Sequence, residues 1–368
     1  MAVKGIIASA PIFDTETQSK TIHVLNKLNN FIDGSEGRNV AMTGVKEITD
    51  RIYEVKTPIA TREAFGDALA DLGKSNPQVV ALDAEVGNST YTERLKETNP
   101  SHFFQMFIDE ENMVSVGLGL SKMGYIPYIS TFAAFLTRAY DQIRMAQYSK
   151  PTLNIVGSHA GCSIGQDGIS QMALEDISMM RSLRESTVLY PADAVSAYKL
   201  TQEMANRKGI SYLRTTREKT PILYKNSEQF PIGGCKVHYC HSREGGNPVK
   251  NHNSKKVNNS LDPLLRGDDT KLTALIISAG ITLHEALKAQ AILEKKKIYT
   301  TVIDLYSIKP LDSKTIQQLA KQIKQIVIVE DHYETGGIGE AVITSCKELN
   351  ADVIFTHLCV HKEPRSGT

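Results

Sequence analysis

The side chains best suited to catalysis gather in residues 157–176, which read GSHAGCSIGQDGISQMALED. This stretch holds one histidine, two aspartates, two glutamines and a glutamate, together with four glycines. Histidine and carboxylates can bind and transfer protons near neutral pH, and glycines let a loop fold closely around a small ligand. The composition therefore predicts a binding or catalytic loop for a small polar molecule; the alternative is a Gly-rich connector.

The position of this loop along the chain supports the first interpretation. A β-branched run at 151–156 precedes it and is typical of a buried strand. A helical pattern that includes Met172, Ile177 and Met180 accompanies its end. In an open parallel sheet, ligands bind beyond the carboxyl ends of the strands, where this loop should lie. We expect Cys162 to fill space in the loop rather than to act in catalysis.

The elements that must hold this loop alternate between strand and helix over two stretches of the chain. Such alternation predicts parallel sheets with helices on both faces. In the first stretch we expect helices at 61–72, 112–123, 132–148 and 194–206, with strands at 79–82, 126–130, 187–190 and 211–214. In the second we expect strands at 272–278, 299–304, 326–329 and 353–357, with helices at 282–295, 313–321 and 339–349. The predicted fold class is α/β, with two tandem doubly wound domains.

Composition excludes several classes of protein. Lysine and arginine number 42 and acidic residues 41, with no basic stripe, so nucleic acid is not an expected partner. The five cysteines form no CxxC pair, which argues against a disulfide framework and a zinc site and favours a cytoplasmic location. No apolar run is long enough for a bilayer, and the first residues lack a signal peptide pattern, so no membrane association is expected.

Two segments stand apart from the alternating pattern. Residues 1–57 contain one amphipathic helical pattern at 21–31 and are expected to form an extension. Residues 240–269 are rich in Asn, Gly and basic side chains, and they separate an expected strand at 234–239 from the next strand. Their arms SREGGNP and DPLLRG match as a translated DNA inverted repeat, similar to the mobile palindromic repeats of some bacterial genomes. We expect this insertion to be a disordered surface loop without a catalytic role.

Several further motifs accompany the loop in a fixed order. They are ATREAFG, LDAEVGNST, FIDEENM, STFAAFLTRAYDQIRMA, YLRTTR, AGITLHEAL and VEDHYETGGIGEA. With the loop, and without the insertion, they make residues 58–367 resemble the C-terminal part of transketolase, closer to its animal-type branch. The resemblance implies a transferase that uses thiamine diphosphate to move two-carbon ketol units between sugar phosphates of the pentose phosphate pathway. The β subunit of a 2-oxoacid dehydrogenase and deoxyxylulose phosphate synthase share the architecture but fit the loop and the STFAAFLTRAYDQIRM motif poorly.

The resemblance implies a cofactor role for three side chains. Glu110 matches the catalytic glutamate that hydrogen-bonds the pyrimidine ring of thiamine diphosphate, and Phe135, with its neighbour Phe132, matches the aromatic that stacks on that ring. From the residues alone, the acidic triplet 109–111 is typical of a helix N-terminus. We expect Asp109 and Glu111 to keep that structural role.

A second set of polar side chains is implied to bind the sugar phosphate. Guanidinium groups and a hydroxyl suit a phosphate dianion, and a histidine that titrates near neutrality suits proton transfer. By resemblance, Arg62, Ser89 and Arg217 grip the phosphate, catalytic His159 and Asp167 contact the substrate hydroxyls, and Gln171 lines the same pocket. Two positions depart from the family pattern: Gln166 replaces a common glutamate and Ile169 a common proline. These departures put turnover in doubt, not the fold.

The diphosphate-binding part of such an enzyme has no counterpart in this sequence. Transketolases hold the diphosphate and Mg²⁺ or Ca²⁺ through an N-terminal domain with a GDG motif, because hard cations prefer oxygen ligands. Residues 1–57 hold no GDG, so no metal ligand is expected in this chain. The chain also stops at PRSGT, where the family continues through a last helix.

Two hypotheses follow. In the first, residues 58–228 and 229–368 are the pyrimidine-binding and C-terminal domains of a split transketolase. The partner would be an N-terminal subunit or domain with the GDG motif, in a homodimer or heterotetramer. In the second, the chain is a non-catalytic remnant with at most a binding role. On either hypothesis, the chain should be inactive without a partner.

Overall fold

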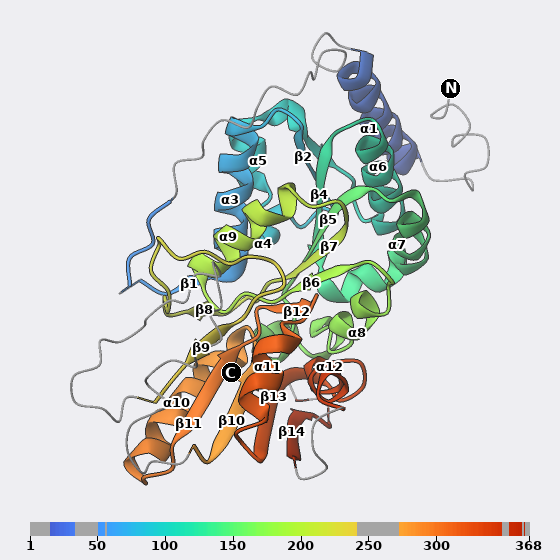
Figure 1. The fold of residues 1–368 in the computed structure, drawn as a ribbon. Coiled ribbons are helices and arrows are strands. Elements are labelled where there is room, and N and C mark those ends of the chain that lie inside the picture. The colour runs from blue at the N-terminus through green and yellow to red at the C-terminus, as the bar shows by residue number, and fades with distance from the viewer. Residues whose placement is uncertain are drawn as a thin grey trace.

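The computed structural model describes residues 15–33, 51–55, 57–240, 272–347, 353–362 and 364. Two α/β sheets follow each other along the chain and are drawn one above the other in Figure 1. The predicted fold class is confirmed. The insertion expected at 240–269 lies outside the described residues apart from Cys240, as do the first residues of the chain and its last ones.

The first sheet has seven strands in the order β12-β6-β7-β5-β4-β2-β3. Six of them run parallel, and their side chains are buried on both faces because helices cover both. They are β2 (Val79–Asp83), β3 (Phe103–Gln105), β4 (Ile126–Phe132), β5 (Thr152–Ser158), β6 (Thr187–Leu189) and β7 (Gly209–Arg214). A separate two-stranded sheet pairs β1 (Ile59–Ala60) with β8 (Lys219–Thr220).

Alternate residues of each strand pack against different helices. Val79 and Ala81 of β2 belong to one apolar cluster, whereas Val80 and Leu82 belong to another. The first cluster contains the apolar faces of α3 (Thr61–Ser75), α5 (Glu93–Thr98) and α9 (Ala194–Ala205). The second contains those of α6 (Glu110–Lys122), α7 (Tyr140–Ala146) and α8 (Asp176–Arg181), as Figure 1 shows. Short turns of helix complete this domain: α4 (Gly87–Thr90), η3 (Pro100–His102), η4 (Ala133–Ala139), η5 (Gln147–Ser149), η6 (Cys162–Asp167) and η7 (Ile169–Gln171).

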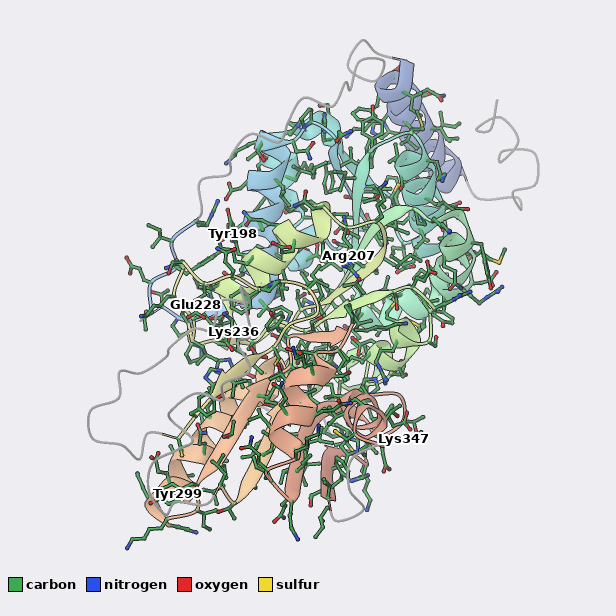
Figure 2. The ribbon with its side chains drawn as sticks, viewed as in Figure 1. Tyr198, Arg207, Glu228, Lys236, Tyr299 and Lys347 are labelled. Carbon is green, nitrogen blue, oxygen red and sulfur yellow. The ribbon has the colours of Figure 1, made fainter. Side chains whose placement is uncertain are left out.

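The second sheet has five strands in the order β14-β13-β10-β11-β9. Four of them run parallel and carry the alternating helices predicted for the second domain. The strands are β10 (Ala274–Ser278), β11 (Thr300–Asp304), β13 (Gln325–Tyr333) and β14 (Ile354–Val360), with helices α10 (Ile281–Lys295), α11 (Ser313–Ala320) and α12 (Ile338–Ser345). The fifth, β9 (Lys236–His238), pairs antiparallel with β11. Lys236 in β9 donates to Glu228 at 3.0 Å, where the linker between the domains meets the second sheet (Figure 2).

Contacts between the two domains include a shared sheet and a buried ion pair. Strand β12 (Ser307–Lys309) comes from the second half of the chain but pairs antiparallel with β6 of the first sheet. Arg214, at the end of β7, is fully buried and donates to Asp176 at 2.9 Å and to Asp331 of β13 at 2.7 Å. Backbone hydrogen bonds and a desolvated charge pair therefore join the two halves.

Three local expectations need correction or extension. The single helix expected at 132–148 is instead the end of β4, a 3-10 helix (η4), α7 and η5, so Phe132 lies in a strand. Met172 precedes α8 rather than lying in it. The helix expected at 21–31 is present and longer, as α1 (Thr15–Asp33).

Helix α1 packs on the first domain. Its Phe31 is buried against the rings of Phe104 and Tyr125, and its Lys27 donates to the carbonyl oxygen of Phe103 at 2.6 Å. Among the described residues, no helix combines the length and apolar character that crossing a membrane requires.

Candidate active site

Glu110 is placed by the start of α6. Asp109 caps this helix by accepting a hydrogen bond from the backbone N–H of Asn112 at 3.2 Å, as expected for an acidic helix N-terminus. This cap leaves Glu110 in the first turn with only 2% of its surface exposed. Its two carboxylate oxygens accept hydrogen bonds from Nη1 of Arg138 at 3.0 and 3.2 Å. The nearly buried carboxylate of Glu110 is thus paired with the guanidinium of Arg138.

Glu110 lines an open pocket of about 290 Å³. Phe135 forms an aromatic wall, and the guanidinium of Arg138 lies 4.9 Å from the centre of its ring. Glu85, with a left-handed φ of 64°, also lines it. The remaining lining residues are Ala84, Val86 and Ile108, which are apolar. A pocket with one aromatic face, apolar sides and one buried carboxylate suits a flat, polar heterocycle.

A row of stacked rings connects this pocket with the loop at 157–176, called the polar loop from here on. Phe135 stacks on Phe132 with ring centres 5.2 Å apart and planes 7° apart. Phe132 in turn stacks on the imidazole of His159 at 3.9 Å and 16°. The structure therefore places His159, predicted from the loop, and Glu110, predicted from a distant motif, at opposite ends of one aromatic row.

His159 is held in an unusual state. Its φ of 61° is left-handed, which is rare for residues other than glycine and common at functional sites. Its Nδ1 lies 2.8 Å from the hydroxyl of Ser158. Burial, with the charges of Arg62 and Arg217 acting in the same direction, lowers the pKa of His159 to about 3. His159 thus differs from a histidine that titrates near neutrality, because burial and two nearby cations oppose its protonation.

Arg62 lies near His159, and its Nε is a donor that could bind an anion. Its Nη1 donates to the carbonyl oxygen of Ser89 at 2.6 Å, and its guanidinium lies 5.2 Å from the ring centre of Tyr91. Burial lowers the pKa of Arg62. Its Nε is buried and has no hydrogen-bond partner among the residues that the structure describes. A buried donor without an acceptor is costly, so an anion there would be stabilising.

The loop that carries Ser89 is organised by a buried carboxylate. Asp83, at the end of β2, accepts hydrogen bonds from the hydroxyls of Thr90 at 2.8 Å and Thr92 at 2.7 Å and from the backbone N–H of Val86. Burial still raises its pKa to about 6. These bonds fix the turn after β2, whose residues Ala84–Val86 line the pocket and whose Ser89 meets Arg62.

Arg217 comes from the segment after β7 and meets the polar loop. Its Nη1 lies 3.2 Å from a carboxylate oxygen of Asp167 and donates to the carbonyl oxygen of Ile164 at 2.7 Å. About 29% of its side chain is exposed, so it can also reach a ligand in solvent. Gln171 is half-buried at the end of the same loop. In the described part of the chain, no hydrogen bond joins the Gln171 side chain or the Ser89 hydroxyl to another predicted site residue.

Arg138 is the site residue that the sequence analysis missed. It belongs to the STFAAFLTRAYDQIRMA motif, where its place three residues after Phe135 was the available signal. A pairing with Glu110 could not be expected from spacing alone. The 3-10 geometry of η4 directs Arg138 to the Phe135 ring and across to the start of α6.

Comparisons with known proteins identify the family of both domains. The model of the transketolase pyrimidine-binding domain matches residues 57–222, and that of the transketolase C-terminal domain matches residues 268–368. The first α/β domain is thus of the transketolase pyrimidine-binding kind, and the second is of the transketolase C-terminal kind. The chain belongs to the transketolase family and corresponds to its C-terminal half.

Individual relatives also place the chain in the transketolase family. The chain is 45% identical over 330 residues to transketolase-like protein 2 of Mus musculus and 44% identical over 317 residues to transketolase of Homo sapiens. These matches cover 89% and 86% of the chain but only 48% and 46% of the relatives, so the chain spans about half their length. A solved structure described as a split gene transketolase, inactive beta4 tetramer, superposes with a TM-score of 0.69 at 32% identity, over 83% of this chain and 89% of that one.

Proposed function

We propose that this chain is the C-terminal subunit of a split transketolase, a thiamine diphosphate-dependent transferase of two-carbon ketol units between sugar phosphates. The observation that carries the proposal is the buried Glu110 on a pocket that shares an aromatic row with His159. The similarity to a split-gene protein whose chain is covered to 89% supports a separate partner chain.

The residues of the pocket fit the pyrimidine end of thiamine diphosphate. Phe135 offers a ring face for stacking, and the Glu110 carboxyl can hold a proton in a hydrogen bond to a ring nitrogen. When bound, the cofactor would supply the carbanion chemistry that ketol transfer requires. For Glu110 to face a ring nitrogen, Arg138 must give up its two contacts with that carboxylate. Because Arg138 is 52% exposed, its guanidinium can turn into solvent.

The other end of the site fits the sugar phosphate. Arg62 and Arg217 present two cations, and the Arg62 Nε is a buried donor that a phosphate oxygen would satisfy. Neutral His159 can exchange a proton with a substrate hydroxyl, and Asp167 and Gln171 would contact the other hydroxyls. A phosphate dianion would offset the charges that lower the pKa of His159, so substrate binding would make this histidine a better proton acceptor.

The diphosphate and a divalent metal, Mg²⁺ or Ca²⁺, would be held by the partner chain. Sugar-phosphate metabolism and five cysteines that form no disulfide support a cytoplasmic setting for the complex. The name of the inactive beta4 tetramer supports self-assembly of such chains without activity. By analogy, this chain alone would form an inactive oligomer that becomes active in a heterotetramer.

Reconstitution with a candidate partner tests the proposal. The chain would be co-expressed with a chain that carries a GDG-type diphosphate-binding domain, and transfer from xylulose 5-phosphate to ribose 5-phosphate would be measured. We expect activity only with both chains, thiamine diphosphate and a divalent metal. Complex formation without any transfer would contradict the proposal and favour a non-catalytic remnant with a binding role.

A further inference from the structure

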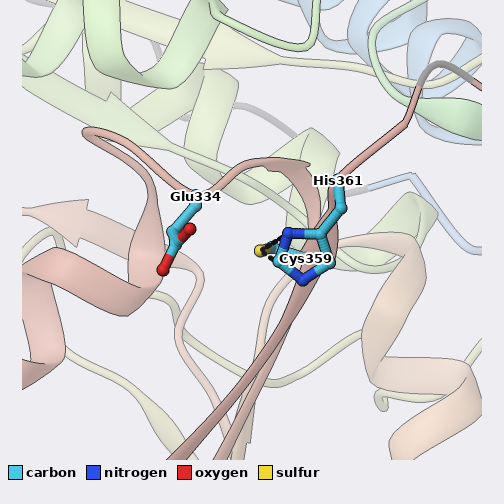
Figure 3. Close-up of side chains that lie close together, drawn as sticks. All are labelled: Glu334, Cys359 and His361. Atoms are coloured by element: carbon cyan, nitrogen blue, oxygen red, sulfur yellow. Dashed lines mark hydrogen bonds between the residues drawn. The ribbon is translucent and has the colours of Figure 1, made fainter.

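Glu334, Cys359 and His361 lie together at one edge of the second sheet. Glu334 follows β13, Cys359 is the penultimate residue of β14, and His361 is the first residue beyond it. The two strands run parallel, with Tyr333 beside Val360 in the register. Since the carboxyl ends of neighbouring parallel strands meet at one edge, they bring the three side chains to the same place, as Figure 3 shows.

The donor atoms of these side chains are close enough to share one ion. A carboxylate oxygen of Glu334, Sγ of Cys359 and an imidazole nitrogen of His361 lie within 4.8 Å of one another. The Cys359 Sγ lies 3.7 Å from Nε2 and 3.9 Å from Nδ1 of His361. Around a tetrahedral zinc ion, with bonds of about 2.0–2.3 Å, sulfur and nitrogen ligands lie about 3.5 Å apart. Small rotations of Glu334 and His361, which are both exposed, would close the difference.

We propose that Glu334, Cys359 and His361 bind a zinc ion, with water in the fourth position. Thiolate, imidazole and carboxylate together are a typical zinc donor set, whereas Mg²⁺ and Ca²⁺ prefer oxygen donors throughout. The site is therefore distinct in chemistry from a magnesium or calcium centre. Its ligands follow no CxxC spacing, because they come from the ends of two strands.

The electrostatic surroundings favour a cation. The carboxylates of Glu334 and Glu330 both lie near the Cys359 thiol. Glu330 itself already accepts hydrogen bonds from the backbone N–H groups of Ile338 and Gly339, at 2.6 and 2.9 Å. Its Oε1 also lies 2.5 Å from Nε2 of His357, so its oxygens are already engaged and do not compete as ligands. A dication bound there would be attracted by these carboxylates.

The position of the site gives the ion a mechanical role. Tyr333 and Val360 are chain neighbours of the three ligands. They pack against an apolar cluster formed by Ile164, Met172 and Leu174, which belong to the loop at 157–176. An ion at this edge would link the end of β13 to the end of β14, next to the surface against which the loop at 157–176 packs. Zinc binding should therefore raise the thermal stability of the chain.

Metal titration of the full chain tests this proposal. After removal of metal with a chelator, Zn²⁺ would be added in excess Mg²⁺ and followed by competition with a chromophoric chelator, and Co²⁺ would report sulfur ligation through its charge-transfer band. We expect one ion per chain. Cys359→Ser should abolish the sulfur band, and His361→Gln and Glu334→Gln should each weaken zinc binding by at least about tenfold.

Cys240→Ser is the matched control, because Cys240 precedes His241 and forms another Cys/His pair in the sequence. It should bind zinc as the unmodified chain does. His361→Gln alters an exposed side chain, so its loss of zinc-dependent thermal stabilisation would not reflect misfolding. Absence of stoichiometric zinc uptake, or loss of binding in Cys240→Ser but not in Cys359→Ser, would overturn the proposal.

Discussion

Two arginine–carboxylate pairs in this protein lie in opposite environments. Arg214 has 0% of its side chain exposed and binds Asp176 and Asp331, whereas Arg138 is 52% exposed and binds Glu110. A buried pair cannot be opened without leaving a desolvated charge, whereas a half-exposed arginine can return to water at little cost. The first pair is thus suited to fixing two domains, and the second to releasing its carboxylate when a ligand arrives.

The buried pair should show the largest effect when broken. Arg214→Met leaves Asp176 and Asp331 buried without their cation, so we expect the free energy of unfolding to fall by about 3–5 kcal/mol. Urea denaturation would measure it. The control is Arg144→Gln, which removes an exposed pair with Asp141 and should change stability by less than about 1 kcal/mol. Equal stabilities of Arg214→Met and the unmodified chain would contradict a fixing role.

Glu110 should matter for activity rather than for folding. In the reconstituted complex, Glu110→Gln keeps the shape of the side chain but removes its acid–base function, so ketol transfer should fall at least about 100-fold. Steady-state kinetics would measure this. Glu111→Gln, at the adjacent exposed position, is the control and should retain activity. A normal turnover rate of the Glu110→Gln complex would contradict a catalytic role for Glu110.

Arg138 should act as a competitor for Glu110. If the guanidinium must leave before the cofactor pyrimidine enters, Arg138→Gln should strengthen thiamine diphosphate binding about three- to fivefold, equivalent to about 1 kcal/mol for an exposed pair. Calorimetry on the complex would measure the affinity. Stability should change by no more than about the same amount. Weaker cofactor binding would instead show that Arg138 supports the pocket through its contact with Phe135.

His159 should show its effect as a dependence of stability on pH. Its folded pKa of about 3 lies below its ordinary value of 6.5, so it takes up a proton on unfolding and the fold loses stability as pH falls through this window. His159→Gln should make unfolding by urea less dependent on pH between about 6.5 and 4. His23→Gln, at an exposed position of α1, should leave the dependence unchanged. An identical pH profile in both variants would contradict the depressed pKa.

The sequence predicted features that leave a local pattern along the chain, and it missed those that depend on contacts between distant residues. Periodicity and apolar runs located most of the parallel strands and the longer helices, because burial on one or both faces leaves a repeating pattern; the parallel strand β3 was not predicted. Strand β9 lies within the strand expected at 234–239, whereas β12, which has three residues and pairs antiparallel at a sheet edge, leaves no periodic signal. Motif order indicated Glu110 and His159. The lowered pKa of His159 and the Arg138 contact depend on residues far apart in the chain, so only the folded arrangement shows them.

Strand β12 also determines how this protein can be divided. It covers the edge of β6 in the first sheet, although it is made after the whole of that sheet and after β11 of the second. A fragment that ended after β8 would expose the backbone donors and acceptors of β6, and uncovered sheet edges promote aggregation. During synthesis, the first domain likewise remains open along this side until the ribosome has passed Lys309. The two halves of the chain are therefore one unit for expression and for design.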